Sequence, residues 1–258
     1  MMLRLIETRM QDATISLVTQ VLRAGGRIVF GGHPAITPMV AQAAIAWKPR
    51  ADVAAPIVIY QSEYFANLQP PPGRDEMIAA GLARMVKTEP GLDRVVQELG
   101  LPQKSAIEWL PEQAPEKAGR ECAEALLCMR LRMLKETLPV GVVCLGGMEG
   151  IEAEARLYRR LLRGPEDGAT ARLFVFRSTF GASARLDEEG AEAFETSYQE
   201  AHGEEDRQLH GLSERGVLQP SAEMAAQQLE NPIRYDRMME VLVRKMADRP
   251  PVQWRFGG

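Results

Sequence analysis

Short, entirely apolar stretches alternate with longer segments of helical periodicity along most of this 258-residue chain. The apolar stretches lack the polar–apolar alternation of a strand that has one face in water, so we expect strands buried on both faces. Strands of this kind separated by helices are typical of a parallel sheet. The predicted strands are 27–30 (RIVF), 55–62 (APIVIYQS), 140–147 (VGVVCLGG) and the start of 171–181 (ARLFVFRSTFG).

Helical segments lie between and after these strands. Gly25 and Gly26 end the first one, and Pro34 or Pro38 begins the next, because proline fits the first turn of a helix. We therefore predict an α/β, Rossmann-like fold with a mostly parallel sheet and helices on both faces. The helices are expected around 15–22, 39–47, 75–86, 116–137, 149–162, 222–229 and 234–247, and 106–111 is a candidate short strand.

The chain changes character near residue 190. Up to that point strands and helices alternate, whereas the remainder is polar and of helical periodicity. We therefore expect a Rossmann-like domain over 1–190 and a helical C-terminal extension over 191–258, which packs on the domain or on a partner.

Composition excludes several classes of partner. A net charge of −4 and an aromatic content of 6% disfavour nucleic acid and anionic membranes. No apolar run approaches the roughly 18–20 residues that span a bilayer, and the N-terminal segment has no signal-peptide pattern. Cys122, Cys128 and Cys144 lack CxxC spacing and are expected to be buried, reduced thiols. The expected location is the cytoplasm.

The exits of three predicted strands carry the functional signal. They are VFGGHPAITP (29–38), CLGGMEGIEAE (144–154) and FRSTFGAS (176–183). Parallel strands bring their exits to one edge of a sheet, so we expect these loops to converge. Glycines let the backbone approach a ligand, and the N-terminus of the following helix favours an anion. We expect a phosphate-bearing ligand there.

Each of these loops also has a purely structural interpretation, because Gly-Gly can simply make a tight turn between strand and helix. Neither Gly-Gly loop fits the P-loop pattern GxxxxGK[ST] or the dinucleotide pattern GxGxxG. A P-loop nucleotidase and a typical dehydrogenase are therefore disfavoured, while nucleotide-like ligands of another fold family stay open.

Five motifs in order resemble the SLOG superfamily: GGRIVFGGHPAITPMV, VIYQSEYF, MRLRML, VCLGGMEGIEAE and RSTFGA. This Rossmann-like group contains LOG phosphoribohydrolases, DNA-processing DprA proteins and sensor domains of bacterial immune systems. The resemblance spans about residues 25–184 and is closest to the sensor-type branch, whose members carry GGHP and GGMEG. It implies a nucleotide-binding module.

The resemblance also suggests how an enzyme of this family would act. Arg130 is similar to the arginine, and Glu154 to the glutamate, that serve N-glycosidic bond cleavage in LOG enzymes. Leu145 and Ile151 replace the proline and threonine of their PGGxGTxxE loop, and GGHP replaces a triple glycine. These departures weigh against catalysis more than against binding. Arg130 and Glu154 also fit charged helix surfaces, and Arg132, two residues on, is expected to face solvent or a partner.

Several candidate side chains have a structural alternative. His33 could contact phosphate or ribose, or could only brace its turn. Ser178 and Thr179 could bind phosphate oxygens or cap the next helix. The predicted ligand-binding residues are Gly31, Gly32, His33, Pro34, Thr37, Gln61, Ser62, Arg130, Gly146, Gly147, Met148, Glu149, Gly150, Glu154, Ser178, Thr179 and Gly181, with Glu154 and Arg130 catalytic if the protein is an enzyme.

The leading hypothesis is a sensor or effector module for a nucleotide or an NAD-derived nucleotide, such as a cyclic ADP-ribose-type signal in anti-phage defence. The alternative is an N-glycosidase acting on a nucleoside monophosphate or NAD. A third hypothesis is a non-catalytic assembly protein that binds a partner through its C-terminal helices. We expect no metal, no required cofactor and a homo-oligomer.

Overall fold

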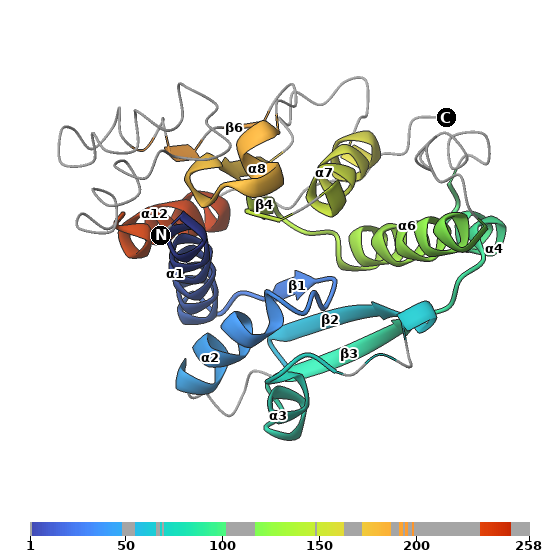
Figure 1. Ribbon diagram of the computed structural model, residues 1–258, viewed down its shortest axis with the longest axis horizontal. Helices are drawn as coiled ribbons and strands as arrows, with labels where there is room; N and C mark the ends of the chain where they lie inside the picture. The colour runs from blue at the N-terminus through green and yellow to red at the C-terminus, as the bar shows by residue number, and fades with distance from the viewer. Residues whose placement is uncertain are drawn as a thin grey trace. The chain divides into compact units, whose positions relative to one another are not determined.

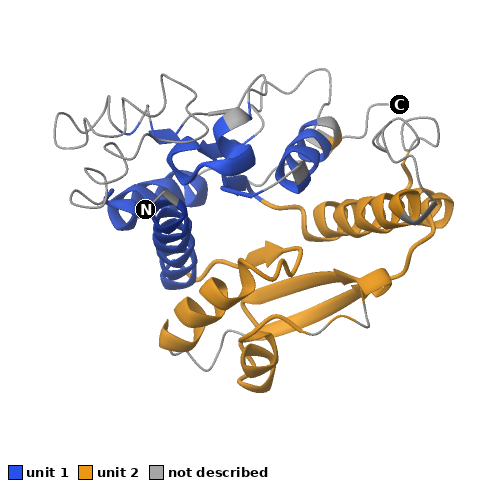
Figure 2. Ribbon diagram, viewed as in Figure 1, with its two compact units in different colours: residues 1–24, 140–159, 167–252 blue, residues 25–139, 160–166, 253–258 orange. Residues whose placement is uncertain are grey.

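The computed structural model describes residues 2–47, 55–65, 68, 70–101, 117–147, 149–162, 172–186, 191–192, 194–195, 198 and 233–248. Its contacts divide the chain into two compact units, shown in Figure 2. Unit 1 comprises residues 1–24, 140–159 and 167–252, and unit 2 comprises 25–139, 160–166 and 253–258.

Unit 2 is built on a three-stranded parallel sheet in the order β1-β2-β3 (Figure 1). β2 is its middle strand, and its first four residues are fully buried, which explains the continuous apolar run. The strands are β1 (Ile28–Phe30), β2 (Ile57–Ser62) and β3 (Ala83–Thr88), and the helices are α2 (Thr37–Trp47), α3 (Arg74–Ala79), α4 (Leu92–Glu98) and α6 (Lys117–Thr137), with a 3-10 turn, η1, at Glu63–Phe65.

One face of this sheet packs against α6. Val58 and Tyr60 of β2 form a buried cluster with Met129 and Met133 of the helix. These methionines are therefore core residues of unit 2. The Tyr60 hydroxyl also donates a hydrogen bond to Glu136, 2.9 Å away. Because successive side chains alternate between faces, Ile57, Ile59 and Gln61 of β2 lie on the other face.

The helix expected over 75–86 is wrong in its second half. α3 ends at Ala79, Gly81 adopts a φ of +70°, and β3 begins at Ala83. β3 is the last strand in the order β1-β2-β3, and part of its surface is exposed. An edge strand of this kind lacks the apolar run that reveals a buried strand.

Unit 1 contains a second three-stranded parallel sheet, in the order β4-β5-β6. Helices α1 and α12, from distant parts of the sequence, pack against each other beside it (Figure 1). The elements are α1 (Met2–Arg23), β4 (Val142–Leu145), α7 (Glu149–Leu162, whose last residues are assigned to unit 2), β5 (Leu173–Phe176), the 3-10 turn η2 (Arg177–Thr179), α8 (Gly181–Arg185), β6 (Ala191–Glu192) and α12 (Tyr235–Ala247).

These elements confirm the predicted α/β, Rossmann-like class with parallel strands. The helices expected at 15–22, 39–47, 116–137, 149–162 and 234–247 are present as α1, α2, α6, α7 and α12. The short strand predicted at 106–111 and the helix predicted at 222–229 lie outside the described residues. Within the part of the chain that the structure describes, no helix has the length and apolarity to cross a membrane.

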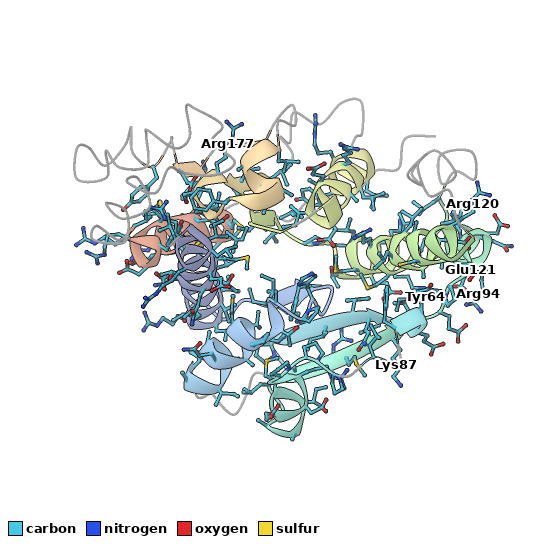
Figure 3. All side chains as sticks on the ribbon, viewed as in Figure 1. Tyr64, Lys87, Arg94, Arg120, Glu121 and Arg177 are labelled. Atoms are coloured by element: carbon cyan, nitrogen blue, oxygen red, sulfur yellow. The ribbon has the colours of Figure 1, made fainter. Side chains whose placement is uncertain are left out.

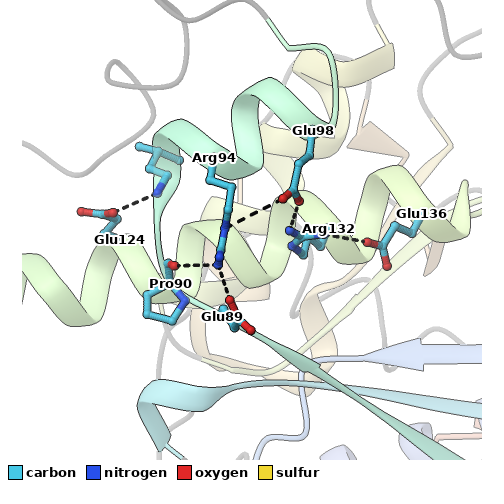
Figure 4. Close-up of polar contacts among 8 residues, drawn as sticks. Glu89, Pro90, Arg94, Glu98, Glu124, Arg132 and Glu136 are labelled. Atoms are coloured by element: carbon cyan, nitrogen blue, oxygen red, sulfur yellow. Dashed lines mark hydrogen bonds and ion pairs between the residues drawn. The ribbon is translucent and has the colours of Figure 1, made fainter.

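A polar network joins α4 to α6 (Figure 4). Arg132 donates to Glu98 of α4 and, over 3.3 Å, to Glu136 on its own helix. The Glu124 carboxylate accepts the Leu92 amide at the start of α4, 3.0 Å away. Arg132 is thus occupied inside unit 2. Such exposed ion pairs contribute only about 0–1 kcal/mol each, so the network orients the helices more than it stabilises them.

Candidate functional site

The GGHP loop follows β1 and lies against β2 in unit 2. Gly32 has a φ of +57°, and a Cβ placed there would lie 3.0 Å from Ile59 Cγ2 and 3.4 Å from the Tyr60 carbonyl oxygen. A side chain at this position would be both strained and crowded. Glycine therefore allows the loop to sit directly on the carboxyl half of β2, where ligands of parallel sheets bind.

His33 is exposed at the tip of this loop and also organises it. Its Nδ1 accepts a hydrogen bond from the Ala35 amide at 3.2 Å, and its carbonyl accepts the Thr37 hydroxyl at 2.8 Å. With Nδ1 as acceptor, the neutral ring carries its proton on Nε2. Nε2 has no hydrogen-bond partner within the described residues. The turn-bracing interpretation is therefore confirmed, and a donor remains for a ligand.

A cleft of about 100 Å³ opens at the ends of β2 and β3. Arg74 directs Nη1 to the Gln61 side-chain oxygen at 3.1 Å and Nε to Asp75 at 2.9 Å. Figure 3 labels Lys87 and Tyr64 in this region. The cleft is lined by Gln61, Ser62, Glu63, Arg74, Met85 and Lys87.

Gln61 and Ser62 were predicted site residues, whereas Arg74 and Lys87 were not. The Ser62 hydroxyl is buried and accepts the Tyr64 amide at 3.3 Å, so it holds the strand end. Lys87 is the β3 partner of Gln61 in the parallel register. A helix over 75–86 does not predict the pairing of Gln61 with Lys87. This pairing follows only when 83–88 is a strand beside β2.

In unit 1, the exits of β4 and β5 come together through their backbones. The Gly146 amide donates to Thr179 Oγ1 at 2.7 Å. The amides of Ala182 and Ser183 donate to the carbonyls of Gly147 and Gly146, at 2.9 and 3.1 Å respectively. Two of the three glycine-containing exits therefore converge, as the sequence predicts. The third, with His33, belongs to unit 2.

The hydroxyl of Thr179 holds this junction. It accepts the Gly146 amide and donates to the Phe176 carbonyl at 2.6 Å, in a fully buried position. Thr179→Val should lower the free energy of unfolding by about 2 kcal/mol, because it leaves the buried Gly146 N–H unsatisfied. Thr179→Ser keeps the hydroxyl and serves as the control. Equal urea midpoints for the two variants would contradict this assignment.

A buried polar cluster lies behind the same turn. Glu195 is 2% exposed and accepts hydrogen bonds from the amide and the hydroxyl of Ser178. The hydroxyls of Ser178 and Tyr235 are 2.6 Å apart. Burial raises the pKa of Glu195 to about 7, although the Ser178 hydrogen bonds and the charge of Arg9 oppose the shift. Burial likewise raises the pKa of Tyr235.

Arg9 brings a positive charge to this cluster from α1. Its guanidinium is 5.8 Å from the Phe180 ring centroid, and the side chain is 3% exposed. Nη1 and Nη2 have no hydrogen-bond partner among the described residues. Burial lowers the pKa of Arg9, while Tyr235 and Glu195 act in the opposite direction. Arg9 and Glu195 lie outside every sequence motif, so no signal in the sequence points to them.

Comparison with known proteins decides the family. The model of the SLOG cluster3 family matches residues 7–89 and 113–202. The chain belongs to this SLOG family. No curated protein and no solved structure matches it. SLOG membership confirms the resemblance of the five motifs and suggests a module that binds or processes a nucleotide-related ligand.

The two residues that resemble the SLOG enzyme pair lie on different units. Arg130 is on α6 of unit 2, and Glu154 is on α7 of unit 1. Glu154 lies near the exit of β4: burial raises the pKa of Cys144 to about 12, and the Glu154 charge adds to the shift. Both side chains are partly exposed and have interaction partners.

The remaining predicted residues of this SLOG protein are distributed over both units. Pro34 is exposed beside His33, Glu149 and Gly150 begin α7, and Met148 lies outside the described residues. No three His, Cys, Asp or Glu side chains are grouped as metal ligands in the described part of either unit.

Proposed function

We propose that this SLOG protein is a sensor or effector module that binds a nucleotide or an NAD-derived nucleotide. The observation that carries the proposal is the carboxyl edge of the unit 2 sheet. There the Gly32 turn lies on β2, and a cleft at the ends of β2 and β3 is lined by Gln61, Arg74 and Lys87. Parallel α/β sheets bind ligands at this edge, and SLOG membership supports a nucleotide-related one.

The groups at this edge have complementary chemistry for such a ligand. The glycine turn permits close approach of a ligand to the backbone. His33 Nε2 offers a neutral donor for a phosphate or ribose oxygen, and the Gln61 amide can both donate and accept. Arg74 and Lys87 supply positive charge. The combination suits a molecule with an anionic end and several hydroxyl groups.

Calorimetric titration with a panel of nucleotides and ADP-ribose derivatives tests the proposal, with chromatography of each mixture for released base. Saturable heat without base release is expected. An absence of heat across the panel would overturn the proposal. Release of free base would instead establish the N-glycosidase alternative, provided that Glu154→Gln abolishes release and retains binding.

Two substitutions of His33 separate its roles. His33→Ala should weaken binding about tenfold, as expected for one lost hydrogen bond to a charged group. His33→Asn can keep the turn, because an Asn side chain also accepts a nearby backbone amide, but it lacks Nε2. If Asn restores wild-type affinity, His33 only braces the loop. Equal losses in both variants support direct contact with the ligand.

A further inference from the structure

We propose that the cleft at the ends of β2 and β3 is an anion subsite in which Arg74 and Lys87 hold a phosphoryl group. The inference rests on the proposed function, since it names the part of the nucleotide that enters unit 2. The cleft, the side chains lining it and their contacts carry the argument.

The sheet register places the two cations around one polar side chain. Gln61 of β2 pairs with Lys87 of β3, so both side chains leave the sheet on the same face. Arg74 reaches this position from the start of α3 and donates to the Gln61 oxygen. Met85, two residues before Lys87 on that face, forms an apolar part of the lining.

Arg74 is oriented before any ligand arrives. Its side chain is 15% exposed and is fixed on one side by Gln61 and on the other by Asp75. These contacts use Nη1 and Nε, and among the described residues Nη2 is left for an anion. Since Asp75 is 64% exposed, water screens its charge, and Arg74 keeps much of its attraction for a second anion.

Glu63 also lines the cleft, and its charge bears on the kind of anion that fits. A carboxylate repels a bare anion but accepts a hydrogen bond from a hydroxyl. Two cations beside one carboxylate therefore favour a phosphate ester that carries a sugar hydroxyl. This is the chemistry of a ribose phosphate.

The size of the cleft limits what can enter. Its volume is about 100 Å³, whereas sites for whole ligands occupy about 300–1,000 Å³. A phosphoryl group fits, and the rest of a nucleotide must lie outside. The GGHP loop lies on the same strand, since a Cβ placed on Gly32 would lie 3.0 Å from Cγ2 of Ile59, two residues before Gln61 on the same face.

Calorimetric titration with ribose 5-phosphate, which carries one phosphoryl group and several hydroxyls, tests the subsite without knowledge of the natural ligand. Arg74→Gln and Lys87→Gln should each raise the dissociation constant about tenfold, because each removes a charged contact. Arg84→Gln is the matched control: Arg84 is exposed on the same strand but leaves the opposite face, so its loss should have no effect.

The outcomes separate this inference from the proposed function. Unchanged affinity for ribose 5-phosphate in both cleft variants, an equal loss in Arg84→Gln, or no binding by the wild type would overturn the subsite. If the wild type binds nucleotides and the cleft variants bind them equally well, only the subsite is wrong. If the wild type binds ribose 5-phosphate but no nucleotide, and the cleft variants lose this binding selectively, the subsite is supported and the proposed function is overturned. Circular dichroism melts check that each variant is folded.

Discussion

Gly181→Ala is expected to destabilise unit 1 by about 3 kcal/mol, combining backbone strain with overpacking. Gly181 has a φ of +63°, and a Cβ there would lie 2.5 Å from the Gly147 carbonyl oxygen and 3.0 Å from the Gly146 carbonyl carbon. These are backbone atoms of the β4 exit, which Thr179 and Ser183 hold in place. The clash therefore cannot be relieved by a side-chain rotation.

Gly100→Ala separates the two causes of this effect. Gly100 has the same φ of +63°, but no atom lies within 4 Å of a Cβ placed there. Its substitution should cost only about 1 kcal/mol, the conformational part alone. Urea unfolding gives the free energies, and hydrogen exchange over 173–183 reports on unit 1 directly. If both variants lose the same stability and exchange alike, the close backbone approach at Gly181 does not exist in solution.

The elements that the sequence predicts well are those whose environment is uniform. β2 and β5 are buried along nearly their whole length, so each position requires an apolar residue and the run is visible. α6 packs one face on the sheet, so Met129 and Met133 recur at helical spacing. Buried and exposed positions are mixed along β3 at the sheet edge, so its sequence shows no apolar run and is wrongly predicted as part of a helix.

The candidate site residues likewise divide into those that the sequence predicts and those that it does not. Glycine loops at strand exits can be predicted from the sequence, because only glycine tolerates the positive φ and the close contacts found at Gly32 and Gly181. The side chains that complete each site come from elsewhere. Ser178 meets Glu195 and Tyr235 at separations of 17 and 57 residues, and Arg74 meets Gln61 across 13. Local periodicity carries no information about such pairs.

Glu195→Gln is expected to stabilise the protein above pH 7 by about 3 kcal/mol while leaving its stability near pH 4 unchanged. Glutamine imitates the protonated acid and can still accept the Ser178 amide hydrogen bond. The pKa of Glu195 is raised from 4.5 to about 7 in the folded protein, chiefly by burial. Ionising this carboxylate therefore costs more free energy in the folded chain than in the unfolded one. The extra cost is about 1.4 kcal/mol for each unit by which the two pKa values differ.

The sign of the pH dependence of stability follows from the number of protons that the folded and the unfolded chain bind. Between pH 4.5 and 7 the unfolded chain has lost the Glu195 proton while the folded chain retains it, so stability falls as pH rises. Above pH 7 both states are ionised, and this contribution becomes constant. The charge of Arg9 on α1 lowers the pKa of both Glu195 and Tyr235, whereas the charge of Glu195 raises the pKa of Tyr235 on α12.

Urea unfolding of wild type and Glu195→Gln from pH 4 to 8 measures the difference. The two curves should diverge between pH 4.5 and about 7 and run parallel above pH 7. Glu240→Gln, a surface substitution on α12 that removes an exposed ion pair with Arg244, should keep the wild-type pH dependence. The opposite result, a wild type that gains stability through pH 7 relative to Glu195→Gln, would mean that attraction to Arg9 outweighs burial. Glu195 would then be the ionised partner required by the Arg9 guanidinium, whose Nη1 and Nη2 have no hydrogen-bond partner among the described residues.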